Sequence, residues 1–355
     1  MRIIILLLCV MLSACSSNQV TVINSKVLPA SPKTDDKQRY KNLFSGDQQY
    51  PKNCTDNCYP NTPAIKCRAK QENCRFVAQQ TMPQLDTPFS VRWLGHASFY
   101  IKAGQQSFLF DPVKEQFDWP VNWAFKLTEG FNRQPGNWPS QAEIDALDGV
   151  MYSHLHYDHF HKGDINDIGN QARYFVPMGT SEHFDNGGYQ IFDMSWYSHY
   201  QIADTKIHFV PAHHFNSRIE VPYLYEDHNK VLWGGWIIEQ QGKKLFFAGD
   251  TGYSPHFKNI HKRYGDMDIC LIPIASYHHE QYSKWYRYVH LTPEDSLQAA
   301  TELNCKVMIP FGYGNNSWKM GDHSSHSALF RLMHTKTMYP NVPLYILNEG
   351  EQVKF

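Results

Sequence analysis

Four side chains of metal-binding types lie within six residues of one another: His154, His156, Asp158 and His159. They follow the apolar run 148–153, which predicts a strand that ends in a loop. Side chains two positions apart on an extended segment point the same way, so His154 and His156 would bind one ion. Asp158 and His159, past the turn, would face a second. Imidazole and carboxylate are ligands of zinc, manganese and iron, so the loop predicts most of a two-metal site.

Two later segments add candidate ligands. Residues 232–238 and 244–253 form a predicted strand pair with Gly242 at the turn, and Asp250 ends its second strand. A carboxylate at the end of a buried strand is costly unless it is paired or bound to metal. Residues 207–218 contain the neighbours His213 and His214. Neighbouring side chains on a strand point opposite ways, and chemistry alone does not choose between these two.

The strands that would position this loop begin at residue 89. Residues 89–101 and 107–110 are rich in aromatic and β-branched residues, and residues 102–106 between them predict a hairpin turn. His96 would lie at the rim of the site or be held by backbone hydrogen bonds. Asp111 would support a metal ligand or only end a strand.

The metal loop resembles the signature of the metallo-β-lactamase-fold hydrolases. The motifs Leu-Gly-His-Ala, Phe-Asp-Pro and Ala-Gly-Asp-Thr-Gly are similar to those of the branch with N-acyl-phosphatidylethanolamine phospholipase D and ascorbate-6-phosphate lactonase. The resemblance covers the chain from about Val91 onwards. It implies an α+β fold, the αββα sandwich, in which two mostly antiparallel sheets pack together with helices outside and metal at one edge.

The resemblance also implies a ligand set. The first ion would be bound by His154, His156 and His214, because the branch usually has Pro-Ala-Gln-His where this chain has His213 and His214. The second ion would be bound by Asp158 and His159, with Asp250 bridging. The cofactor would be one or two zinc ions, with manganese or iron as alternatives.

Two residues would act in catalysis. Asp158 would also orient the nucleophile. The branch places a histidine near the substrate phosphate or leaving group at the position of His290, just before a predicted helix with Thr292 as N-cap and Pro293 at its first position. A histidine that merely flanks the helix is the alternative.

One position departs from the family pattern. The strand at 306–312 normally ends in the last histidine of the second metal, and this chain has Pro310 or Gly312 there. Either His323 or His326 would substitute, Asn315 or water would fill the place, or only one metal would bind firmly.

The start of the chain predicts export. Residues 1–14 resemble a bacterial lipoprotein signal, too short to span a bilayer, and Leu12-Ser13-Ala14-Cys15 resembles a lipobox with Cys15 as the lipidated residue. An ordinary signal peptide with an incidental cysteine is the alternative. The acyl chains would hold the protein at a membrane, and Ser16 would suit an outer membrane facing the periplasm.

The rest of the chain divides into three predicted parts: a flexible tether at 15–50, a cysteine-rich extension at 51–85 and a hydrolase domain at 86–355. In an exported chain, Cys54, Cys58, Cys67 and Cys74 predict two disulfides of undetermined pairing, with structural zinc or free thiols as alternatives. Two further cysteines, Cys270 and Cys305, lie among apolar neighbours and predict small buried residues. The aromatic loop 113–140 would be a lid, a membrane-contacting surface or a cover for the sheet.

Charge and resemblance together indicate a function. The net charge of −1 provides no basic field for nucleic acid. The resemblance implies hydrolysis by a metal-bound hydroxide, acting on a small-molecule or lipid phosphodiester as in phospholipase D-like enzymes. A hydrolase of lactones, cyclic esters or β-lactams, or a non-catalytic metal-binding envelope lipoprotein, is the alternative. Oligomeric state is left open.

Overall fold

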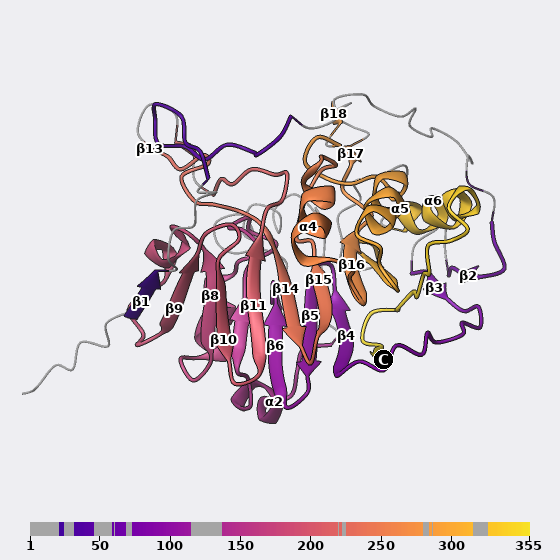
Figure 1. The fold of residues 1–355 in the computed structure, drawn as a ribbon, viewed down its shortest axis with the longest axis horizontal. Helices are drawn as coiled ribbons and strands as arrows, with labels where there is room; N and C mark the ends of the chain where they lie inside the picture. Colours follow the sequence, from indigo (N-terminus) through magenta and orange to yellow (C-terminus); the bar gives the residue numbers. More distant parts are fainter. Residues whose placement is uncertain are drawn as a thin grey trace, which may run out of the picture.

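Two stacked β-sheets form the body of the protein (Figure 1). The computed structural model describes residues 21–24, 32–45, 59, 61–68, 73–114, 137–218, 220–221, 225–279, 284–285, 287–314 and 326–355. This sandwich with outer helices confirms the predicted αββα fold.

The first sheet has eight strands, which run in spatial order from one edge to the other as β1 (Thr21–Asn24), β9 (Gln190–Met194), β8 (Arg173–Pro177), β7 (Gly149–Met151), β6 (Gln106–Phe110), β5 (Ser98–Ala103), β4 (Phe89–Gly95) and β20 (Gln352–Lys354). The second has six, which run as β10 (His199–Ile202), β11 (Thr205–Val210), β14 (Gly235–Gln240), β15 (Lys243–Phe247), β16 (Ile269–Pro273) and β19 (Met308–Phe311). Smaller pairs are β12 (Glu220–Val221) with β13 (Tyr225–Glu226) and β17 (His278–His279) with β18 (Lys284–Trp285).

Both sheets are mixed, which corrects the expectation of mostly antiparallel sheets. Strands β6 to β9 are parallel neighbours, as are β15, β16 and β19. The reason is the connections: α2 (Gln141–Asp145) lies between β6 and β7, α3 (Lys162–Ile168) between β7 and β8, α4 (His256–Tyr264) between β15 and β16, and α5 (Pro293–Glu302) between β16 and β19. A crossover through a helix returns the chain in the same direction, whereas a tight hairpin reverses it.

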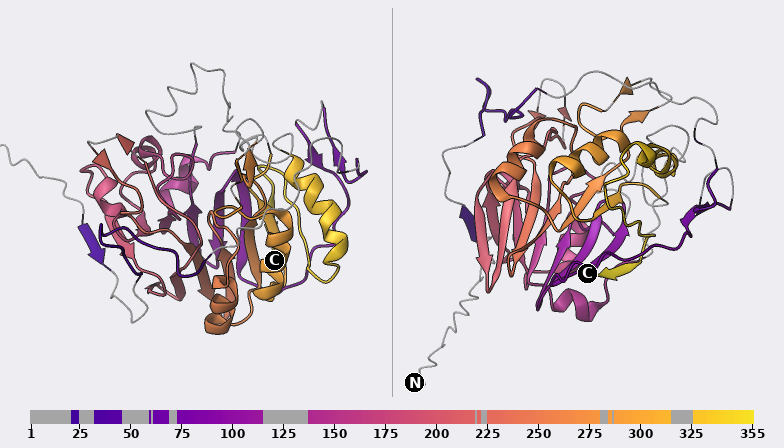
Figure 2. Two further views of the ribbon diagram at one scale, coloured as in Figure 1. Left: turned by 90° about the horizontal axis from the view of Figure 1, so that it is seen from above. Right: turned by 45° about the vertical axis from the view of Figure 1, so that its right-hand side comes forward.

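The remaining helical elements are η1 (Thr180–His183), α6 (Ser327–Thr335) and η2 (Lys336–Met338). The helix predicted at residue 293 is α5, and Thr292 caps it through a reciprocal bond with Asp295. In the rotated views, α4, α5 and α6 gather beside the six-stranded sheet (Figure 2).

The core lies between the sheets and follows from alternation along the strands. Phe99 and Phe110 of the first sheet meet Phe247 of the second, with ring centroids 6.0 and 5.1 Å apart. Tyr100, one residue from Phe99, belongs instead to a separate apolar cluster with residues of α2 and α3. Side chains alternate across a strand, so the first sheet is covered on both faces.

The run 89–101 is two strands rather than one. Strand β4 ends at Gly95 and β5 begins at Ser98, and the turn between them places Gly95 at φ 110° and His96 at φ 49°. Positive φ is costly for a residue with a Cβ. The hairpin turn expected at 102–106 consists of two residues, Gly104 and Gln105, and Gly104 has a φ of 58°.

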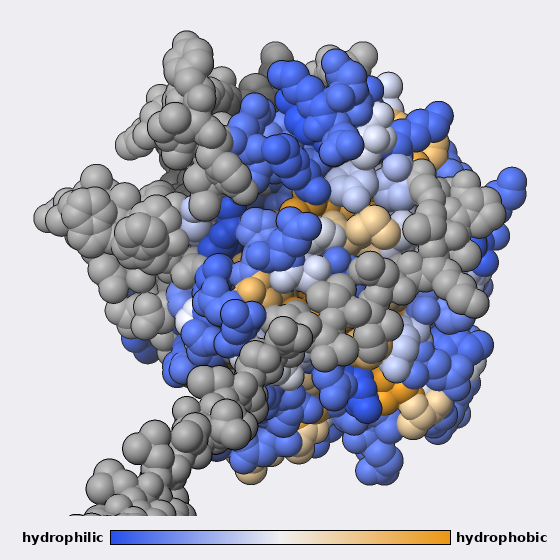
Figure 3. Space-filling model, turned by 90° about the vertical axis from the view of Figure 1, so that its left-hand side faces the viewer, coloured by the Kyte–Doolittle hydropathy of each residue, from blue (hydrophilic) through white to orange (hydrophobic). Residues whose placement is uncertain are grey.

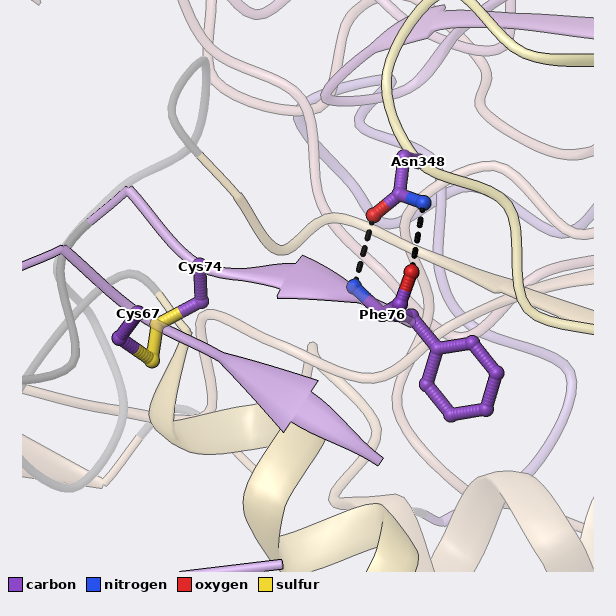
Figure 4. Close-up of a disulfide and its surroundings, with 4 residues drawn as sticks. All are labelled: Cys67, Cys74, Phe76 and Asn348. Carbon is purple, nitrogen blue, oxygen red and sulfur yellow. Dashed lines mark hydrogen bonds between the residues drawn. A yellow bond between two sulfur atoms is a disulfide. The ribbon is translucent and has the colours of Figure 1, made fainter. Parts of the chain in front are cut away.

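The cysteine-rich segment is held to the end of the chain. Cys67 and Cys74 form a disulfide beside β2 (Ile65–Lys66) and β3 (Arg75–Phe76), as Figure 4 shows. Phe76 N donates to Asn348 Oδ1 at 2.8 Å, and Asn348 Nδ2 donates to Phe76 O at 3.0 Å. The predicted partners Cys54 and Cys58 lie outside the described residues.

A second disulfide joins Cys270 and Cys305, 35 positions apart. The sequence predicts their burial correctly, with exposures of 0% and 6%, but not their bond. Cys270 lies on β16 and Cys305 between α5 and β19, and only the tertiary packing brings them together.

Two described parts of the predicted tether contact the domain. Strand β1 pairs in parallel with β9, and Asn42 hydrogen-bonds to the backbone of His214. Residues 1–14 and Cys15 lie outside the described residues. Within the described ranges, no helix has the length and apolar character needed to span a bilayer.

Candidate metal centre

The predicted metal loop follows β7 and is braced from the segment after His214. His159 N and Phe160 N both donate to His156 O, at 3.0 and 2.9 Å, and this closes the turn. Asn216 Oδ1 accepts from Leu155 N at 3.0 Å. Arg218 donates to Phe160 O at 2.8 Å as well as to Leu155 O. Buried backbone groups need such partners, so the loop is held rigidly.

The first cluster consists of His154, His156 and His214. Nε2 of His154 lies 2.9 Å from Nδ1 of His156, and Nε2 of His214 lies 3.2 Å from the same atom. His154 and His214 are buried at 1% and 0% exposure. Three ring nitrogens therefore converge on one point.

Hydrogen bonds fix which nitrogen of each ring faces that point. His154 Nδ1 donates to Ser153 Oγ at 2.8 Å, which in turn donates to Asp111 Oδ2 at 2.6 Å. His214 Nδ1 donates to Val289 O at 2.9 Å. With the protons on Nδ1, the Nε2 lone pairs of His154 and His214 are left for a metal, which is the usual support of a histidine ligand.

Burial keeps the three rings neutral. It lowers the pKa of His156 to about 4 and the pKa values of His154 and His214 well below the usual range. The neighbouring histidines act in the same direction on His154. Metal ligands must be unprotonated, so this cluster is ready for a cation at neutral pH.

The second cluster consists of His96, Asp158 and His159. His96 Nε2 lies 3.0 Å from Asp158 Oδ2. His159 Nδ1 donates to Asp111 Oδ2 at 2.8 Å, so its Nε2 faces the other carboxylates. Asp111 is fully buried and accepts from Ser153 N as well, so it supports one ligand in each cluster.

Asp250 lies between the clusters. Its Oδ2 is 3.2 Å from His159 Nε2 and 3.5 Å from His290 Nδ1, and it forms a further cluster with His214 and His290. Burial opposes its charged form, but His159 and His290 outweigh burial and lower the pKa of Asp250 far below its usual range. For the same reason, Asp250 and Asp158 raise the pKa of His159 well above its usual range against the effect of burial.

The donor set fits metal ions. Ligand nitrogens about 2.1 Å from one tetrahedral zinc ion lie about 3.4 Å apart, and the 2.9 and 3.2 Å within the first cluster are somewhat shorter than this. His159 Nε2 is buried and makes no well-aligned hydrogen bond within the described ranges, although Asp250 Oδ2 is near. A cation between these groups would satisfy both.

Among the paired candidates, the structure separates His213 from His214. His213 points away from the clusters, with Nδ1 2.8 Å from Tyr288 O and Nε2 3.1 Å from Phe44 O.

Pro310 lies within β19, opposite Ile272 of β16. His326 is the N-cap of α6 and belongs to none of the four ligand clusters that the described residues form. His323, Asn315 and most of the aromatic loop lie outside the described residues.

Four supporting residues were not predicted from the sequence. Asn42 donates to His214 O at 2.8 Å and accepts from His214 N at 3.0 Å, from a segment that reads as a polar tether. Asn216 and Arg218 follow His214 closely in the sequence, and that proximity was the available signal. Ser153, directly before His154, is the last of these residues, and its hydroxyl donates to Asp111 Oδ2.

Comparisons with known proteins agree with this geometry. A family model described as "Beta-lactamase superfamily domain" matches residues 106–313, more than half of the chain. The chain is 26% identical over 236 residues, 62% of its length, to N-acyl-phosphatidylethanolamine-hydrolyzing phospholipase D 1 of Caenorhabditis elegans. It is 29% identical over 113 residues, 32% of its length and 77% of the relative's, to outer membrane protein RomA of Klebsiella pneumoniae.

The matched region covers 63% of the length of the C. elegans protein, and the same share of uncharacterised relatives from Mycobacterium tuberculosis. Among solved structures, a metallo hydrolase of Ignicoccus hospitalis shares the fold with a TM-score of 0.50 at 17% identity. That likeness covers 75% of this chain and 98% of the other. This protein therefore belongs to the β-lactamase superfamily, as a member with the metallo-β-lactamase fold that is similar to the N-acyl-phosphatidylethanolamine phospholipase D branch.

Proposed function

We propose that this protein is a metal-dependent phosphodiesterase, with zinc as the metal and a lipid or small-molecule phosphodiester as substrate. The position of Asp250 carries the proposal, because this carboxylate borders both ligand clusters. It lies 3.2 Å from His159 of the second cluster, and it groups with His214 of the first, with ligand atoms within 4.8 Å of each other. Two ions about 3.5–4 Å apart suit in-line displacement, because they stabilise the attacking and leaving oxygens together. The similarity to the C. elegans phospholipase supports a phosphodiester substrate.

Two side chains in the proposed site are open enough to meet a substrate. Those of Asp158 and His290 are each 14% exposed, whereas that of His159 is 0% exposed. Bound metal ions would supply a Lewis acid and lower the pKa of water toward neutrality. Asp158 would then act on the attacking water, and His290 would act on the leaving group.

The protonation states of Asp158 and His290 favour these two roles. His159 and His96 lower the pKa of Asp158 well below its usual range against the effect of burial, so its carboxylate would accept a hydrogen bond from the attacking water and orient it. Burial lowers the pKa of His290, although Asp250 opposes this. A neutral His290 ring would donate a hydrogen bond to the charge that develops on the leaving oxygen.

Turnover on two kinds of substrate tests the reaction class. Metal-loaded full-length protein should hydrolyse bis-p-nitrophenyl phosphate and N-acyl-phosphatidylethanolamine in mixed micelles, and a chelator should abolish both activities. Asp250→Asn should lose at least 100-fold in kcat, because neither cluster keeps its shared carboxylate. Turnover of nitrocefin or homoserine lactones instead would assign a carbonyl hydrolase. No turnover of any of these with metal bound would assign a non-catalytic lipoprotein.

We also propose that lipid on Cys15 attaches the protein to a bacterial membrane facing the periplasm. Disulfides persist mainly in oxidising compartments, so the bond between Cys270 and Cys305 supports export. The relative RomA is named an outer membrane protein. On the face in Figure 3 the described residues are mainly hydrophilic, with only small apolar spots. The Cys15→Ala variant should appear in the soluble fraction rather than in the membrane fraction after cell fractionation. An unaltered membrane distribution would contradict this proposal.

A further inference from the structure

We propose that His96 is the third protein ligand of the second metal ion, in place of the histidine that the family pattern leads one to expect at the end of β19. The inference rests on the proposed two-metal hydrolase and deepens it. It assigns a ligand to the one coordination position that the sequence leaves unfilled, where Pro310 has no donor atom.

The turn that carries His96 lies beside the end of β19. Gly312 N donates to His96 O at 3.3 Å, and Trp93 Nε1 donates to the same oxygen at 2.9 Å. The two segments are 216 positions apart in the chain, yet they meet at one edge of the sandwich. A ligand from this turn can therefore serve the position that a ligand from β19 serves in relatives.

The backbone of His96 is held in an unfavourable conformation. Its φ is 49°, although the residue has a Cβ, and two hydrogen bonds on its carbonyl hold the turn in place. Such conformations persist only where the surrounding structure enforces them, and they gather at functional sites. Here the conformation turns the side chain into the interior, where the residue is 4% exposed.

The side chain lies among the second metal's expected ligands. His96 Nε2 is 3.0 Å from Asp158 Oδ2, and its ring centroid is 5.2 Å from that of His159. The ligand atoms of these three residues all lie within 4.8 Å of one another. Adjacent ligands about 2.1 Å from one ion lie about 3.4 Å apart in tetrahedral geometry and about 3.0 Å apart in octahedral geometry, and the contact between His96 and Asp158 is within this range.

The other histidines that could bind the second ion lie elsewhere or are tested directly. His290 belongs to the cluster with His214 and Asp250, on the side of the first ion. His326 begins α6 and joins none of the clusters that the described residues form. His323 is outside the described residues and is therefore tested directly.

Metal titration of full-length protein in detergent, with zinc and with cobalt(II), tests the assignment. Wild type should bind two equivalents. His96→Asn should keep the first with unchanged affinity and bind the second at least 100-fold more weakly. The matched variants His326→Asn and His323→Asn should keep both equivalents. Two equivalents of wild-type affinity in His96→Asn, or loss of the second ion in His323→Asn, would overturn the proposal.

A spectroscopic variant provides a positive signal that does not depend on activity. In cobalt-loaded His96→Cys, a thiolate-to-cobalt charge-transfer band should appear as the second equivalent binds, because residue 96 would then coordinate through sulfur. His326→Cys is the matched control and should show no such band. This arm remains decisive if His96→Asn folds poorly, and absence of the band in folded His96→Cys would refute coordination at residue 96.

The outcomes separate this inference from the proposed reaction. If wild type binds two ions and the second depends on His96, but no phosphodiester is cleaved, the ligand assignment stands and the reaction class fails. If phosphodiesters are cleaved by a wild type that binds a single ion, the reaction class stands and the assignment of His96 fails.

Discussion

Replacing Asp111 by asparagine should weaken binding of the second metal while leaving the fold intact. Asp111 is fully buried, and its Oδ2 accepts from both His159 Nδ1 and Ser153 Oγ. Oδ1 accepts from Ser153 N at 2.6 Å, which fixes the amide oxygen of an asparagine on that side. The new NH2 group would then face both His159 Nδ1 and Ser153 Oγ, so the link from Ser153 to His154 would change as well.

The consequence is a change of tautomer. His159 Nδ1 would have to accept a hydrogen bond, so the neutral ring that a metal requires would carry its proton on Nε2, the nitrogen that lies 3.2 Å from Asp250. A protonated Nε2 cannot bind a metal. Loss of such supporting partners typically costs about 10–100-fold in metal affinity, or about 1.4–2.7 kcal/mol.

Isothermal titration with zinc, at constant pH and buffer, measures the two affinities in Asp111→Asn. Ser153→Ala is the matched variant, since it removes the bond that connects Asp111 to His154 and should weaken mainly the first ion. Thermal unfolding without metal checks that both variants fold. Wild-type affinity for the second ion in folded Asp111→Asn would refute the assignment of Asp111 as the support of His159.

Three further outcomes follow from the described contacts. Burial, reinforced by Arg218, lowers the pKa of His183 to about 4, so its neutral form stabilises the fold above pH 6.5 and that contribution is lost as pH falls toward 4. The loss is at most about 3 kcal/mol, and denaturant unfolding of His183→Gln at several pH values should show a correspondingly shallower slope. The double variant Cys270→Ala with Cys305→Ala should unfold with up to about 4 kcal/mol less free energy, since it frees a loop of sequence separation 35; equal stability of wild type and variant would contradict this. Asn42→Ala removes both hydrogen bonds to the backbone of His214, and it should lower the affinity for the first zinc ion by about 10-fold in the same titration. Asn42→Asp should lower that affinity less, because it keeps the acceptor for His214 N.

Much of the site is local in sequence, and local patterns could therefore predict it. His154 and His156 lie two positions apart in the loop that follows β7, and their facing ring nitrogens are 2.9 Å apart. Asp250 lies three residues after Phe247, the last residue of β15, and a largely buried carboxylate there needs a partner. Strands, turns and the cap of α5 likewise depend on neighbours in the chain, and most of them lie where the sequence predicts them.

Other features depend on contacts between distant segments. The composition of run 89–101 does not reveal the turn at His96, whose carbonyl accepts hydrogen bonds from the distant Gly312 as well as from Trp93. Asn42 contacts His214 across 172 positions, and a polar segment gives no sign of this. The mixed direction of the strands follows from how the crossover helices pack.

The sequence by itself determined the kind of chemistry, because the types and short spacing of His154, His156, Asp158 and His159 specify metal binding before any folding. Only the tertiary structure decided which distant groups complete each ligand cluster. It places His214 rather than His213 toward the first cluster, and it brings His96 to 3.0 Å from Asp158. The reason is physical: the direction of a side chain at a turn or strand end is set by the segments packed around it, which residue types alone do not specify.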